Sequence, residues 1–135
     1  MRFVPVMAMA LTVVACAADL SGRRGFEIAA DPAFRAAYPS LAAGVGDLMD
    51  VSGPSERIGG ATAVSGCRTH VCPYAAAFLA FDGRGSGMLA RTEGGRPGVS
   101  VETVGDWRSA VPTEVREAYG KWLEGLSQSP LPTPR

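Results

Sequence analysis

The stretch Tyr74-Ala75-Ala76-Ala77-Phe78-Leu79-Ala80-Phe81 is apolar along its whole length and gives the strongest strand signal in the chain. A strand that is apolar on both faces is normally central in its sheet and covered on both sides. The covering layers are expected to be helices, and a second subunit is an alternative cover, so a homodimer is compatible with this strand. The stretch therefore predicts a sheet enclosed between two layers.

Shorter strand signals on either side of this stretch extend the sheet. Asp82-Gly83-Arg84-Gly85-Ser86-Gly87 follows it as a hairpin loop. Residues 87–92 and 99–104 supply two further strands, joined by a glycine-rich connection over 93–98. Residues 57–66 form a weaker strand that precedes the apolar stretch in the chain. Because consecutive hairpins join neighbouring strands, the sheet is expected to be antiparallel.

Helical signals lie on both sides of these strands. Asp31-Pro32 is an N-cap followed by proline at the first helical position, and the short helix that it opens ends at Pro39. A second short helix is expected over residues 41–49. A longer helix begins at Thr113, with an acidic first turn and an apolar stripe of Val115, Tyr119, Trp122, Leu123 and Leu126. The fold class is therefore α+β: a small antiparallel β-sheet with short N-terminal helices and a C-terminal helix packed on it.

The N-terminus has the pattern of a bacterial export signal. A basic start is followed by an uncharged apolar run over residues 3–15, too short for a membrane span of about 20 residues. Ala15-Cys16-Ala17 suits cleavage before Ala18, whereas Val13-Val14-Ala15-Cys16 resembles a lipobox that would leave Cys16 lipidated. Both interpretations stay open. We therefore expect a periplasmic protein, either soluble or anchored by lipid on Cys16.

The rest of the chain divides into three parts. Residues 18–30 are expected to be a flexible lead-in, residues 31–126 a single domain, and the proline-rich residues 127–135 a disordered tail. The chain carries 13 basic and 13 acidic side chains. This balance argues against nucleic acid and other polyanions as partners.

Cys67-Arg68-Thr69-His70-Val71-Cys72 encloses the only histidine in the chain. In an oxidising compartment two cysteines this close are expected to pair as a disulfide, which would tie the residues between them into a small rigid loop. Arg68 and His70 would stand at its tip as donors suited to acidic partners. The loop is thus a candidate for insertion into a cleft.

Two plainer interpretations of this loop stay open. The cysteine pair can be a structural staple with His70 an ordinary surface histidine. Cysteine and histidine at this spacing can also be three metal ligands, but that requires reduced thiolates and a fourth ligand, and residues 18–135 hold no other cysteine or histidine. No nucleophile stands out beside the single histidine, so the chain is not interpreted as an enzyme, and no cofactor is expected.

The loop, the strand before it and the three strands after it resemble the Ivy family (inhibitor of vertebrate lysozyme). The resemblance runs loosely from Asp31 to Trp107 and is strongest between Gly59 and Glu93. It implies an inhibitor of c-type lysozyme whose disulfide-closed loop enters the enzyme cleft. His70 would contact the two catalytic carboxylates there, which would hold the imidazole as imidazolium.

The loop departs from the family's C-K-P-H-D-C-like pattern at three positions. Arg68 replaces lysine, Thr69 replaces proline and Val71 replaces an acidic residue, while both cysteines and the histidine are kept. Arg68 retains the positive charge. Thr69 and Val71 leave an alternative open, in which an Ivy-like envelope protein binds another cell-wall lytic enzyme, such as a lytic transglycosylase, without inhibiting lysozyme.

Overall fold

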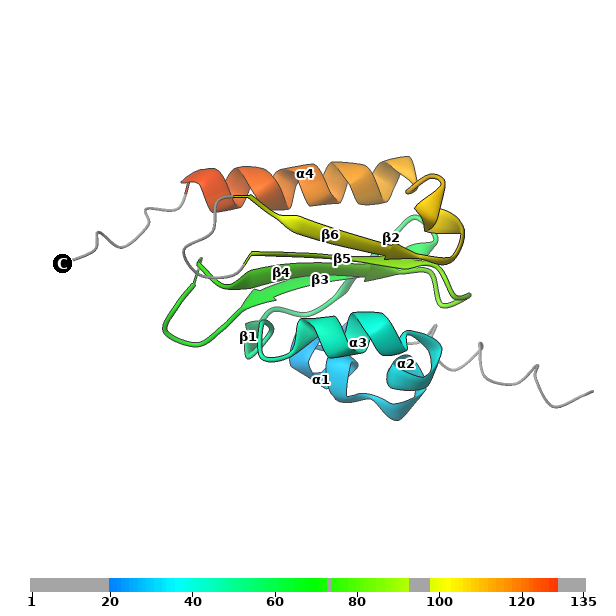
Figure 1. The fold of residues 1–135 in the computed structure, drawn as a ribbon, viewed down its shortest axis with the longest axis horizontal. Helices are drawn as coiled ribbons and strands as arrows, with labels where there is room; N and C mark the ends of the chain where they lie inside the picture. The colour runs from blue at the N-terminus through cyan, green and yellow to red at the C-terminus, as the bar shows by residue number, and fades with distance from the viewer. Residues whose placement is uncertain (1–19, 73, 93–97, 129–135) are drawn as a thin grey trace, which may run out of the picture.

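The computed structural model describes residues 20–72, 74–92 and 98–128 and arranges them in three layers (Figure 1). A sheet lies in the middle, three short helices cover one face, and one long helix covers the other. The helices are α1 (Gly25–Ala30), α2 (Pro32–Ala37), α3 (Pro39–Val45), α4 (Thr113–Gln128) and the 3-10 helix η3 (Gly105–Arg108). The strands are β1 (Val51–Ser52), β2 (Glu56–Ile58), β3 (Ala61–Cys67), β4 (Ala76–Phe81), β5 (Gly87–Thr92) and β6 (Ser100–Val104).

The sheet is antiparallel throughout, as the consecutive hairpins predicted. Its order is β1-β3-β4-β5-β6, and β2 pairs with β3 beside β1. β1 and β6 are therefore at opposite edges. β4 is central, and Phe78 in it stands opposite Ser65 on β3 and Ala90 on β5.

Every residue of β4 is buried, because its two faces serve two different cores. Ala77, Leu79 and Phe81 pack among the side chains of α1, α2 and α3. Phe78 and Ala80 pack on the other face, where the stripe of α4 meets them through Val115, Tyr119 and Trp122. The cover that the sequence required for this strand thus comes from helices of the same chain.

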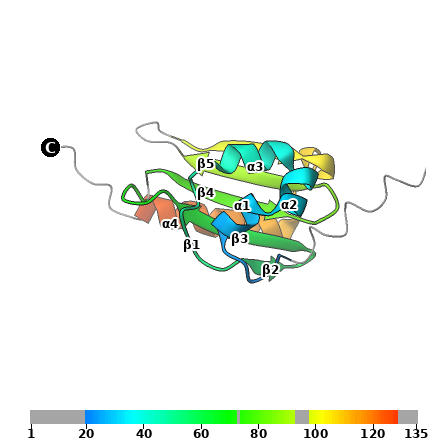
Figure 2. The ribbon, with the colours of Figure 1, turned by 90° about the horizontal axis from the view of Figure 1, so that it is seen from below.

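The short helices lie across one face of the sheet, with α1 against β1 and β3 and α3 against β5 (Figure 2). Asp31 caps α2 as predicted, since its Oδ1 accepts hydrogen bonds from the amides of Ala33 and Phe34. The second helix differs from its predicted bounds of 41–49. It begins at Pro39, because proline suits the first helical turn, and ends before Gly46, which has a φ of +51°.

Part of the expected flexible lead-in is ordered. α1 occupies residues 25–30, and Leu20 and Ile28 are buried in the core. Hydrogen bonds from the Ser55 hydroxyl to the Leu20 carbonyl and from the Gly22 amide to the Ser55 carbonyl fix this segment against the chain before β2. Leu20 and Ile28 are separated by the polar run over residues 21–25, so the sequence shows no apolar pattern there that would predict an ordered segment.

Two other differences concern element bounds. The weak strand expected over 57–66 is a hairpin of β2 and β3, which turns at Gly59 with a φ of +62°. α4 continues to Gln128, two residues into the predicted tail. The predicted export signal (1–17), Cys16 and the rest of the tail (129–135) lie outside the described residues. No helix among residues 20–72, 74–92 and 98–128 is long and apolar enough to cross a membrane.

Candidate functional site

The cysteine-bounded loop is the connection between β3 and β4. β3 ends at Cys67, which forms a disulfide with Cys72, and their Cα atoms lie 5.3 Å apart. Two backbone hydrogen bonds join the loop to the start of β4: the Arg68 amide donates to the Ala75 carbonyl at 2.8 Å, and the Ala75 amide donates to the Val71 carbonyl at 3.1 Å. The loop is thus held at its base by the disulfide and by two hydrogen bonds. Because the two sulfurs are bonded to each other, the thiolates that a metal site requires are not present.

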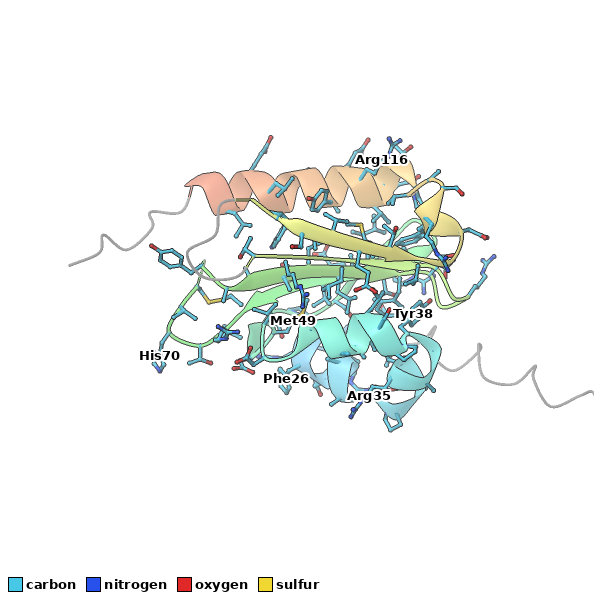
Figure 3. The ribbon with its side chains drawn as sticks, in the orientation of Figure 1. Phe26, Arg35, Tyr38, Met49, His70 and Arg116 are labelled. Atoms are coloured by element: carbon cyan, nitrogen blue, oxygen red, sulfur yellow. A yellow bond between two sulfur atoms is a disulfide. The ribbon has the colours of Figure 1, made fainter. Side chains whose placement is uncertain are left out.

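His70 stands at the tip of this loop, at one end of the molecule (Figure 3). The amide of Val71 donates to the Arg68 carbonyl at 3.2 Å, so residues 68–71 form a turn with His70 in its third position. This position has a φ of +69°, and His70 is the only non-glycine residue in the described part of the chain with a positive φ. The left-handed region is unfavourable for most side chains, although histidine is among those that occupy it more often. The turn places the imidazole in solvent, away from the sheet.

Arg68, which was expected at the tip of the loop, lies instead at its base and forms an ion pair with Asp47. Its Nη2 is 2.9 Å from Asp47 Oδ1, and both side chains are partly exposed. The hydrogen bond and the positive charge from Arg68 hold the pKa of Asp47 below its usual value. Asp47 follows α3 and lies far from the loop in sequence. Its pairing with Arg68 was not predicted from the sequence, because nothing local marks such a partner.

Gly66 allows the segment that carries Asp47 to approach β3 closely. A Cβ atom at Gly66 would lie 2.7 Å from the Val51 carbonyl oxygen and 2.8 Å from Ser52 Cβ. Such contacts are too close, so any larger residue would push β1 away. The glycine therefore keeps the segment before β1, including Asp47, beside the loop.

Val71 points inward. Its half-buried side chain packs against the core formed by the short helices and one face of the sheet. Thr69 and His70, by contrast, are exposed. Of the four residues between the cysteines, Thr69 and His70 thus form the exposed tip, Arg68 braces the base and Val71 anchors the loop to the core. A single apolar residue within a polar loop was the signal that could have indicated this anchor.

The glycine-rich hairpin loop over residues 82–87 lies at the other end of the sheet and is organised around Tyr38. The Tyr38 hydroxyl accepts hydrogen bonds from the amides of Gly83 and Gly85 and donates one to Asp82 Oδ1. The same Asp82 oxygen accepts hydrogen bonds from the amides of Arg84 and Ser86. Burial is the main reason that the pKa of Tyr38 rises to about 12. The hydroxyl, the carboxylate and the backbone amides are thus hydrogen-bonded to one another. The role of this glycine-rich loop is therefore explained by the fold.

A family model described as "Inhibitor of vertebrate lysozyme (Ivy)" matches residues 38–125. The match covers all six strands, the cysteine-bounded loop and most of α4. No curated protein and no solved structure matches the chain.

Proposed function

The chain belongs to the Ivy family of inhibitors of vertebrate lysozyme, and on that premise we propose that it inhibits c-type lysozyme by inserting the Cys67–Cys72 loop into the active-site cleft. The observation that carries this proposal is the position of His70, exposed at the tip of a loop whose base is closed by a disulfide. A loop that is already rigid loses little conformational entropy on insertion, so more of its contact energy appears as affinity.

The chemistry of the cleft suits an imidazole at this position. Glycoside hydrolases of this kind place two carboxyl groups on either side of the scissile bond. A protonated imidazole has two N–H donors and one positive charge, so it can donate to both carboxyl groups and is stabilised by their negative charge. His70 is therefore the principal contact in our proposal, and Thr69 lies beside it at the tip.

The departures of the loop from the family pattern are compatible with inhibition. Val71 takes the place of an acidic residue, but its side chain packs into the core and away from the tip. Arg68 keeps the positive charge of the family's lysine and is held beside Asp47. These contacts support retention of the tip geometry, and the family match favours lysozyme as the target over a lytic transglycosylase.

The test is a titration of lysozyme's lytic activity with the oxidised protein and with a His70→Asn variant. Asparagine tolerates a positive φ but carries no positive charge, so this variant preserves the turn better than alanine would. We expect the wild type to inhibit and the variant to be at least about tenfold weaker, as for a central contact in an interface. Equal inhibition by the two folded proteins would remove His70 from the mechanism. A wild type that fails to inhibit lysozyme but binds a lytic transglycosylase would favour the alternative target.

We also propose that the protein acts in the periplasm after export. The first 17 residues support this, and the inhibitor must be outside the cytoplasm to meet an external lysozyme. The mass of the N-terminal peptide of the mature protein distinguishes a soluble form from a lipid-anchored form. A chain that begins at Ala18 is soluble, and a chain that begins at an acylated Cys16 is anchored; an unprocessed Met1 in the cytoplasmic fraction would contradict export.

A further inference from the structure

The Cys67–Cys72 loop is too small to form a stable complex alone. Specific protein–protein interfaces bury about 800 Å² on each partner and involve roughly 20–30 residues on each side. Only Thr69 and His70 form the exposed tip of the loop. An inhibitor that binds through this loop therefore needs a second contact surface next to it.

β1 lies directly beside the loop and exposes an apolar side chain. Val51 stands opposite Cys67 in the antiparallel pairing of β1 with β3, and it is 52% exposed. Asp50, the residue before it, is also exposed. This edge of the sheet thus presents an apolar side chain and a carboxylate next to the disulfide.

α1 extends the same surface. Phe26 on this helix is 48% exposed, an unusual position for a phenylalanine. It lines a groove of about 430 Å³ together with Met49 and Asp50, which lead into β1. Phe26 and His70 lie on the same side of the sheet, as Figure 3 shows. We refer to Phe26, Asp50 and Val51 as the flank patch.

The described residues contain one further exposed large hydrophobic side chain, Val101, which is 50% exposed. It lies on β6, at the edge of the sheet opposite β1. Two of the three exposed large hydrophobics are therefore on the side of the loop, and the third provides a matched control.

We propose that the flank patch is the second half of the binding surface and contacts the rim of the enzyme cleft while His70 is inside it. The inference rests on the proposed function. Interfaces combine buried aromatic and aliphatic side chains with a polar rim, and the patch has this composition. The partner surface that fits it is an apolar lip beside the cleft, contacting Phe26 and Val51, with a basic side chain facing Asp50.

The test compares Val51→Ser and Phe26→Ala with Val101→Ser in the lysozyme inhibition titration. Val51→Ser and Val101→Ser make the same chemical change at nearly the same exposure, 52% and 50%, on opposite edges of the sheet, so Val101→Ser is the control for position. We expect Phe26→Ala and Val51→Ser each to weaken inhibition about fivefold or more, and Val101→Ser to leave it unchanged. Asp50→Asn is expected to slow association and to reduce its dependence on salt. Circular dichroism confirms that each variant is folded.

Inhibition by Phe26→Ala and Val51→Ser equal to that of the wild type would overturn the flank patch and leave the proposed function intact. Equal weakening by Val101→Ser would also overturn it, because the effect would then not depend on position. Loss of inhibition in His70→Asn with normal inhibition by both patch variants would assign binding to the loop alone. A folded wild type that does not inhibit lysozyme would overturn the proposed function and the patch together.

Discussion

At the scale of single residues, the site depends on the conformation of one turn. His70 occupies its third position with a φ of +69°, and Thr69 precedes it in the second position. The second position of such turns favours proline, whose ring fixes φ near −65°. The backbone of this loop thus suits a proline at position 69, although the sequence has threonine there.

Thr69→Pro is expected to stabilise the protein by about 0.4–1 kcal/mol, because it reduces the freedom of the unfolded loop without straining the folded turn. Inhibition should be equal to that of the wild type or stronger. Thermal unfolding and the lysozyme titration measure the two effects. A destabilised variant would show that the φ angle of Thr69 is incompatible with proline, and a folded variant that inhibits less would show that the threonine side chain contacts the enzyme.

At the scale of secondary-structure elements, the two ends of β4 are fixed in different ways. The disulfide, the Arg68–Asp47 ion pair and Val71 hold the loop before it. Tyr38 and Asp82 hold the hairpin after it, through hydrogen bonds to the backbone of residues 83–86. The contacts of Tyr38 and Asp82 stabilise the fold and are not part of the candidate site, because they lie at the end of the sheet opposite His70 (Figure 3).

Tyr38→Phe is expected to destabilise the protein by about 1–3 kcal/mol, since two backbone amides lose their acceptor. The pKa of Tyr38 is about 12 in the folded protein against 10.0 in the unfolded chain. The folded state therefore holds the hydroxyl proton of Tyr38 more tightly than the unfolded chain does. The resulting contribution to the free energy of unfolding is fully present below pH 10 and is lost as the pH rises to 12. Unfolding measured across this range should show a steeper loss for the wild type than for Tyr38→Phe. Parallel curves would contradict the assignment, and inhibition at neutral pH should be the same for both proteins.

At the scale of the whole molecule, the sequence predicts the layers well but not the contacts that support the site. The apolar stretch around Phe78 identifies the central strand because its pattern is local, and the hairpins that follow are marked by glycine. The pairing of Asp47 with Arg68 could not be predicted, since it depends on how α3 and β1 pack against β3. The order in α1 was missed for a related reason: its stability comes from burial of Ile28 in the core and not from its own six residues.

The most direct test of loop insertion is the protonation state of His70 in the complex. It is the only histidine in the chain, so its ring gives the only imidazole signals of ¹⁵N-labelled protein. Spectra are recorded at about pH 8, where an ordinary histidine is neutral, with the protein free and saturated with unlabelled lysozyme. Two carboxyl groups around the ring predict that His70 is imidazolium in the saturated complex. A neutral ring in the saturated complex would contradict the contact between His70 and the catalytic carboxylates.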